Sequence, residues 1–122
     1  MTPEKQRSEI AKLCNWKLQT HVPIECEESA IMCWIRPGND DWQPEQLPDY
    51  LNDLNACYQF TAYMDYDQQV EFARILSAIV LENPSDFWWD LNAQETFQVL
   101  DASAAQRCEA FLKVFDKWES QP

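Results

Sequence analysis

Residues 65–81 read DYDQQVEFARILSAIVL, and this stretch decides the helical character of the chain. Its apolar side chains recur at helical spacing: Phe72, Ile75, Leu76, Ile79 and Val80. The spacing predicts a helix from Tyr66 to about Leu81 with a wide buried face. Asp65 occupies the N-cap position and Gln68 follows three residues later, which is the pattern of a capping box. We therefore expect this helix to lie centrally in the core.

Three further helices are expected, two before this stretch and one after it. Pro3 suits a first helical position, and the first helix should run from Pro3 to about Asn15. A second is expected from Pro48 to about Met64, with Asp49 and Asp53 as neighbours on its polar side. Its predicted apolar stripe consists of Leu51, Leu54, Tyr58 and Thr61 and is widened by Cys57 and Ala62. Ser103, with Gln106 at the capping-box position, should begin a last helix whose apolar spacing continues to Trp118.

Strand signals are weaker than helix signals in this chain. The apolar run Ala30 to Arg36, which precedes Pro37-Gly38, is typical of a strand. Residues 87–100 fit either a hairpin or a helix, and we favour at least one strand, Thr96 to Leu100, because it is rich in β-branched and aromatic residues. The sequence therefore predicts an α+β protein. We expect one helix-rich acidic globular domain over residues 1–122, with about four helices packed on a small antiparallel sheet.

The negative charge is confined to the middle of the chain. Residues 1–36 and 107–122 each contain as many bases as acids. Residues 37–106 contain 13 acids and a single base, Arg74, so this stretch carries the whole net charge of −12. With a pI near 4.2, simple electrostatic binding to nucleic acid or to an anionic membrane is excluded, because those partners are themselves negative. The expected partner is cationic.

The cysteines and the chain start indicate a reducing compartment. The five cysteines are Cys14, Cys26, Cys33, Cys57 and Cys108. Their odd number and wide spacing favour free thiols, and the start MTPEK has no apolar stretch of the kind found in signal peptides. No apolar run approaches the ~20 residues of a membrane helix. We expect a cytosolic protein, with Cys14, Cys57 and Cys108 as small buried side chains.

Two stretches resemble a known group of proteins. Residues 49–56 (DYLNDLNA) and the stretch 102–118, which begins ASAAQRCEAFL, are similar to small proteins encoded in bacteriophage and prophage genomes, including the phage ABA sandwich domains. The resemblance covers about the last two-thirds of the chain. It implies a phage origin and a small antiparallel sheet between helices. That group has no settled biochemical role, so no catalytic residue is transferred.

Motifs for catalysis or cofactor binding are missing from the sequence. Gly38 is the only glycine, which excludes phosphate-cradling loops. His21, the only histidine, is interpreted as an ordinary loop residue, and Cys26 and Cys33 are too far apart for a typical structural zinc site. We expect no enzyme activity, no metal and no cofactor.

Two functions remain open. In the first, a phage protein inhibits a host defence nuclease, in the manner of anti-restriction or anti-CRISPR proteins, because its carboxylates replace phosphates in a basic groove. The candidate contact residues are Asp40, Asp41, Trp42, Glu45, Asp49, Asp53, Asp65 and Asp67, with Trp42 as an anchor. In the second, the protein is a structural, assembly or regulatory phage component that forms a homo-oligomer through an apolar face containing Trp88 and Trp89.

Overall fold

A computed structural model describes residues 1–21, 31–38, 46–82 and 91–119 of the chain. These residues form five helices and one two-stranded sheet. The helices are α1 (Pro3–Leu13), α2 (Leu54–Thr61), α3 (Tyr66–Leu81), α4 (Ala93–Leu100) and α5 (Ala104–Val114), and the strands are β1 (Lys17–His21) and β2 (Ile31–Ile35). The predicted class, a helix-rich α+β protein, is confirmed.

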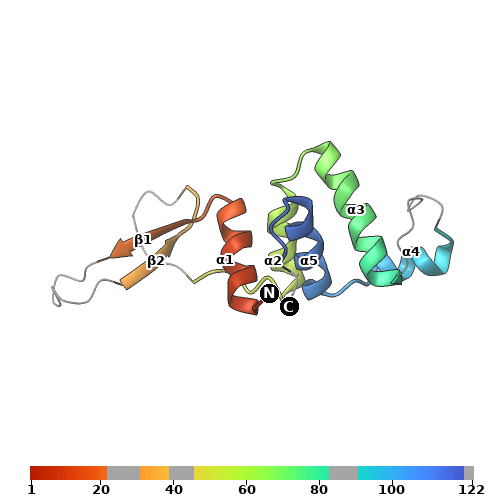
Figure 1. Ribbon diagram of the computed structural model, residues 1–122, viewed down its shortest axis with the longest axis horizontal. Coiled ribbons are helices and arrows are strands. Elements are labelled where there is room, and N and C mark those ends of the chain that lie inside the picture. The colour runs from red at the N-terminus through yellow and green to blue at the C-terminus, as the bar shows by residue number, and fades with distance from the viewer. Residues whose placement is uncertain (22–30, 39–45, 83–90, 120–122) are drawn as a thin grey trace.

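The elements follow one another along the long axis of the molecule. Figure 1 shows the sheet at one end, then α1, then α2 beside α5, then α3, and α4 at the far end. The helices pack chiefly on each other: α5 contacts α1, α2 and α3, and α3 also contacts α4. No described helix lies beyond the sheet, so the sheet is not enclosed between helices as the resemblance to ABA sandwich domains implies.

The two strands pair in an antiparallel ladder. Lys17 lies opposite Ile35, and His21 lies opposite Ile31 at the other end. The predicted strand within Ala30–Arg36 is therefore confirmed as β2, whereas its partner β1 was not assigned from the sequence. Cys33 lies opposite Gln19 in this ladder, and Cys26 falls outside the described residues.

The predictions for α3 and for the start of α5 are confirmed down to the N-caps, whereas α5 ends at Val114, before the predicted helical spacing reaches Trp118. The Asp65 carboxylate accepts a hydrogen bond from the backbone N–H of Gln68 at 2.8 Å. In return, the backbone N–H of Asp65 donates to Gln68 Oε1 at 2.9 Å. Ser103 and Gln106 form the same reciprocal pair before α5. Each box satisfies two backbone N–H donors that the start of a helix leaves unpaired, which fixes where the helix starts.

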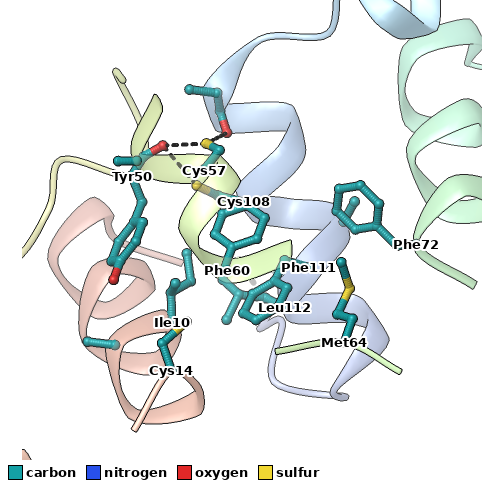
Figure 2. Close-up of a cluster of buried hydrophobic side chains, with 14 of the residues drawn as sticks. Ile10, Cys14, Tyr50, Cys57, Phe60, Met64, Phe72, Cys108, Phe111 and Leu112 are labelled. Carbon is teal, nitrogen blue, oxygen red and sulfur yellow. Dashed lines mark hydrogen bonds between the residues drawn. The ribbon is translucent and has the colours of Figure 1, made fainter. Parts of the chain in front are cut away.

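The centre of the core is α5 rather than α3. Cys108, Phe111 and Leu112 on α5 have no exposed surface, and the rings of Phe60 on α2 and Phe111 stack with centroids 4.3 Å apart (Figure 2). α3 contributes Phe72, Leu76 and Ser77 as buried residues, and its other residues are partly buried or exposed. The expectation of a central α3 is wrong because α4 covers it only partly, whereas α5 has helices around it.

The second predicted helix is shorter than expected. α2 begins at Leu54 with Asp53 as its N-cap, and residues 48–53 form turns instead of helix. One cause lies in a distant contact: the Arg7 guanidinium on α1 donates to the Leu47 carbonyl at 2.8 Å and to the Pro48 carbonyl at 3.3 Å. The expected four-residue spacing of Asp49 and Asp53 along a helix surface is therefore wrong.

The preference for a strand at Thr96–Leu100 is also wrong. These residues belong to α4, which starts from a capping box between Asn92 and Glu95. The Glu95 amide donates to Asn92 Oδ1 at 2.8 Å, and the Asn92 amide donates to Glu95 Oε1 at 3.2 Å. The predicted hairpin over residues 87–100 is wrong for the same reason, since its second strand is part of a helix. Residues 87–90 lie outside the described part of the chain.

Candidate functional site

Four of the eight predicted contact residues lie in the described chain. Asp49, Asp53, Asp65 and Asp67 are all exposed to solvent. The other four, Asp40, Asp41, Trp42 and Glu45, fall within 39–45, outside the described residues. The geometry of the candidate surface is therefore that of the aspartates next to α2 and α3.

One aspartate pair lies at the start of α2. The Asp53 side chain accepts a hydrogen bond from the backbone N–H of Asn55 at 2.9 Å and so caps the helix. Asp49, four residues earlier, accepts a hydrogen bond from the Asn52 side-chain amide at 3.2 Å. Both carboxylates are exposed, and they accept these hydrogen bonds from neutral amides.

The second pair lies at the start of α3. Asp65 is the N-cap of this helix, and Asp67 is in its first turn. The partial positive charge of a helix N-terminus stabilises carboxylates at these positions. The local sequence thus gives both aspartates a structural reason to be there, and it still leaves their charge exposed.

The two pairs do not converge into one cluster. Asp53 precedes α2, and Asp65 follows its end, so the eight residues of α2 separate the pairs. A helix of that length spans about 12 Å. Figure 1 shows the chain leaving α2 at the end opposite to its start before it enters α3. The four aspartates therefore form two negative groups, one before the start of α2 and one after its end.

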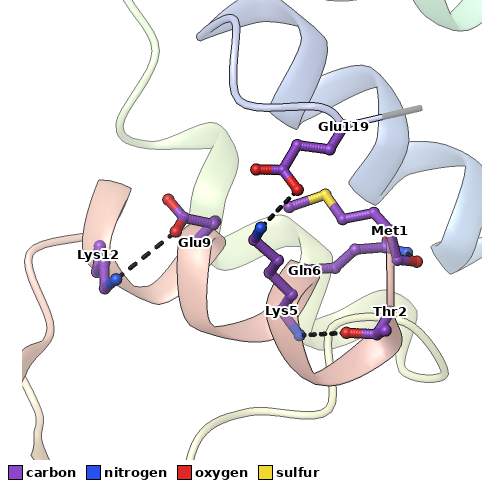
Figure 3. Close-up of polar contacts among 7 residues, drawn as sticks. All are labelled: Met1, Thr2, Lys5, Gln6, Glu9, Lys12 and Glu119. Atoms are coloured by element: carbon purple, nitrogen blue, oxygen red, sulfur yellow. Dashed lines mark hydrogen bonds and ion pairs between the residues drawn. The ribbon is translucent and has the colours of Figure 1, made fainter. Parts of the chain in front are cut away.

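Three lysines of the terminal stretches form ion pairs with terminal acids. Lys5 Nζ lies 2.5 Å from Glu119 Oε2, and Lys12 Nζ lies 3.6 Å from Glu9 Oε1 (Figure 3). On α5, Lys113 pairs with Glu109 at 3.4 Å, as the four-residue spacing predicts. In each pair both partners come from residues 1–36 or 107–122, the stretches whose charges already balance.

Among the described acids of residues 37–106, only Glu71 forms a salt bridge with a described base. All nine lysines and arginines of the chain belong to the described residues, and Arg74 alone comes from the acidic stretch. Arg74 binds Glu71, one turn earlier, and this hydrogen bond is the main cause of the lowered pKa of Glu71. Among the described residues, Asp49, Asp53 and the two aspartates at the start of α3 form no salt bridge.

A third acidic group was missed by sequence reasoning. A shallow depression of about 560 Å³ lies between the end of α3, the α4 helix and the start of α5. Its lining includes Glu82, Glu95 and Asp101 and no lysine or arginine. The assignment of Thr96–Leu100 to a strand hid this arrangement, because Glu95 lies in the first turn of α4 and Asp101 is its C-cap.

The exposed face of α2 contains apolar side chains. The buried residues of α2 are Ala56, Cys57 and Phe60, whereas Leu54 and Tyr58, one helical turn apart, are 44% and 60% exposed. The predicted stripe of Leu51, Leu54, Tyr58 and Thr61 is therefore on the wrong face at its two central positions. Tyr66, at the first position of α3, is 77% exposed. Large side chains thus lie between and beside the two aspartate pairs.

The described residues contain no metal-binding constellation. No group of three or more His, Cys, Asp or Glu residues among them is arranged to hold a metal ion. In the same part of the chain, no helix is both long and apolar enough to cross a membrane.

Comparison with known proteins gives no relative for this chain. No protein-family model, no curated protein and no solved structure matches it.

Proposed function

We propose that this protein is a phage-encoded, non-enzymatic inhibitor that occupies the basic nucleic-acid groove of a host defence enzyme in the bacterial cytosol. The observation that supports the proposal is the separation of charge. Three acids of the terminal stretches, Glu9, Glu109 and Glu119, pair with lysines, whereas the described aspartates on either side of α2 form no salt bridge. A negative surface without internal partners favours binding to an external cationic one.

The spacing of the aspartate pairs suits a phosphate-binding groove. The pairs are separated by about 12 Å of helix. Consecutive phosphates on one strand of a duplex advance by about 3.4 Å along the axis, so the length of α2 corresponds to between three and four such steps. Arginines arranged to hold a nucleic-acid backbone would then meet a carboxylate at each end of α2.

The exposed side chains on α2 add a neutral contact between the charged ends. Tyrosine is enriched among the residues that dominate protein interfaces, and its ring accepts an arginine guanidinium on its face. Tyr58 and Tyr66 are the described candidates for this contact. Trp42, predicted as an anchor, belongs to the same proposal through its neighbours Asp40 and Asp41.

The test is inhibition of DNA cleavage by purified restriction enzymes and Cas nucleases. Two double variants remove charge and retain the helix caps: Asp49→Asn with Asp53→Asn, and Asp65→Asn with Asp67→Asn. A third removes Asp40 and Asp41 in the same way. The matched control is Glu9→Gln with Glu119→Gln, which removes two charges outside the acidic stretch.

We expect the native protein to inhibit at least one enzyme, with inhibition that weakens as salt rises. At least one aspartate variant should raise the inhibitory concentration about tenfold or more, while the control variant stays within twofold. Absence of inhibition across the panel, or equal inhibition by all variants, would exclude the proposal.

A second candidate is a phage assembly or regulatory component that forms a homo-oligomer. It is favoured by α4, where Phe97 and Leu100 are 72% and 66% exposed, and none of the helix residues is buried. Light scattering at moderate salt would separate the two functions. A stable dimer that dissociates in a Phe97→Ser, Leu100→Ser variant supports the second candidate, and a monomer at all concentrations excludes it.

A further inference from the structure

Two thiols from different helices share one acceptor in the core. Cys57 Sγ on α2 lies 3.0 Å from the carbonyl oxygen of Tyr50, and Cys108 Sγ on α5 lies 3.2 Å from the same oxygen (Figure 2). Cys57 Sγ is also 3.7 Å from the carbonyl oxygen of Ala104. Both cysteines are buried and reduced in the structure. Since both sulfurs approach a single atom, they lie beside each other across the α2–α5 contact.

The two thiols are chemically unequal. The pKa of Cys57 is lowered, and the largest cause is a hydrogen bond with Cys108. Burial acts in the opposite direction, and the positive charge of Arg107 lowers the pKa further. The pKa of Cys108 is raised, first by the same hydrogen bond and then by burial. Cys57 is therefore the sulfur better able to become a thiolate, which is the nucleophilic form.

We propose that Cys57 and Cys108 form a dithiol site that small-molecule disulfides oxidise to an intramolecular disulfide between α2 and α5. The proposal rests on the shared acceptor and on the juxtaposition of the two helices. It does not depend on the proposed inhibitory function.

The reaction proceeds in two exchanges. Cys57 loses its proton, and its thiolate attacks one sulfur of the oxidant, so a mixed disulfide forms and one small thiolate leaves. Cys108 then loses its proton and attacks Cys57 Sγ, which forms the Cys57–Cys108 bond and releases the second small thiolate. The protein loses two electrons and two protons, and the oxidant takes up both to become two small thiols.

Access to the buried sulfurs requires a local opening. α2 has only eight residues, and the segment before it forms turns, so this region has fewer helical hydrogen bonds to break than α3. The segment is anchored in part by the two S–H bonds to the Tyr50 carbonyl. A disulfide removes both donors, so oxidation would loosen the backbone that carries Asp49 and Asp53.

Cys14 provides an internal control. It is buried at the C-cap of α1, but burial alone raises its pKa to about 12, and no thiol among the described side chains is assigned to it as a partner. If burial were the only determinant of oxidation, Cys14 would behave like Cys57. The proposal instead predicts that Cys14 stays a thiol.

The experiment incubates the folded native protein with glutathione disulfide or diamide, alkylates the remaining thiols and maps the cysteines by mass spectrometry of proteolytic peptides. We expect a species that has lost two hydrogen atoms, with the Cys57 and Cys108 peptides joined and Cys14 alkylated only after unfolding. The oxidised protein should melt at a temperature at least about 5 °C higher, because the crosslink closes a long loop.

Two variants complete the test. Cys108→Ala should stop at the mixed disulfide with glutathione on Cys57, whereas Cys14→Ala should still form the crosslink. If Cys108→Ala does not fold, the peptide map of the oxidised native protein tests the proposal by itself. A map that shows no Cys57–Cys108 peptide, or one that joins either residue to Cys14, Cys26 or Cys33 instead, would overturn the proposal.

Discussion

The ring of Phe60 on α2 lies against the ring of Phe111 on α5, with centroids 4.3 Å apart and planes inclined by 24°. Phe60 also meets Tyr50 and Phe72, with centroids 6.1 and 6.4 Å away, and Phe111 meets Phe115 at 5.0 Å. The stacked pair therefore connects α2, α3 and α5 through one chain of aromatic contacts. Offset and edge contacts of this kind add to the stabilisation from burial.

Truncation of this pair should destabilise the whole domain. Phe111→Ala removes a fully buried ring, and we expect the free energy of unfolding to fall by about 3–5 kcal/mol. Phe97→Ala, at an exposed position on α4, is the matched control and should change it by less than about 0.5 kcal/mol. Urea titration followed by tryptophan fluorescence measures both. Equal losses in the two variants would contradict this account of the core.

Tyr50 has a buried hydroxyl without a partner. The side chain has no exposed surface, and its oxygen is the one buried side-chain polar atom of the described residues that lacks a hydrogen bond. An unpaired buried hydroxyl costs free energy, so Tyr50→Phe should raise the free energy of unfolding by about 1 kcal/mol. Tyr58→Phe, on the exposed face of α2, should have no comparable effect. A less stable Tyr50→Phe protein would show that the hydroxyl has a partner in solution.

Asp65 allows its capping role to be separated from its charge. Asparagine caps helices about as well as aspartate, so Asp65→Asn should cost only a few tenths of a kcal/mol. Asp65→Ala loses the acceptor for the Gln68 amide and should cost about 1 kcal/mol. Chemical denaturation of both variants checks this difference. A cost for Asp65→Asn as large as that for Asp65→Ala would mean that the charge, not the hydrogen bond, stabilises α3.

Buried thiols should make the protein sensitive to alkaline pH. Burial raises the pKa of Cys14 from its ordinary value of 9.0 to about 12. The folded state thus holds this proton more tightly than the unfolded state does. Its contribution is complete below about pH 9 and is lost as the pH rises through about 12, with a slope of at most about 1.4 kcal/mol per pH unit.

The Cys14→Ala variant tests this contribution. Its free energy of unfolding should decline less steeply than that of the native protein between pH 9 and 11, while the two slopes agree between pH 7 and 8. Urea titrations across this range supply the slopes. Parallel curves above pH 9 would contradict the assigned pKa. Burial also raises the pKa of Tyr50, and that effect is common to both proteins.

The parts of the fold that the sequence predicted are those with local signals. The bounds of α3 follow from the Asp65–Gln68 box at one end and from a helix that stops before Asn83-Pro84 at the other. α5 was found for the same reason. Capping and periodicity act over a few residues, so a sequence displays them directly.

The errors arose where distant contacts or competing local signals decide. The late start of α2 accompanies contacts from Arg7, about 40 positions away in the chain, which no local pattern reveals. In α4, the Asn92–Glu95 box outweighs the β-preference of residues 96–100, because a satisfied helix start is stronger than an intrinsic propensity. The buried face of α2 consists of Ala56, Cys57 and Phe60, so the expected burial of Cys57 is confirmed, whereas the predicted stripe was wrong at Leu54 and Tyr58.

For the candidate site, the sequence showed that the acids of residues 37–106 have only one base among them. It did not show where these acids lie on the folded protein. The segregation of charge follows from composition along the chain alone. The division of the described aspartates into two pairs could not be predicted, because it depends on where α2 begins and on the turn between α2 and α3.

The ion pair between Lys5 and Glu119 places the first turn of α1 beside the segment that follows α5. A short flexible peptide could therefore join the two ends of the backbone without stretching it. New ends could be opened at Ala62 and Tyr63, which are exposed and lie between α2 and α3. Such a circular permutant would keep every helix intact and place its free termini beside Asp65, where a fused reporter would shield that end of α2 from a partner and leave the Asp53 end open.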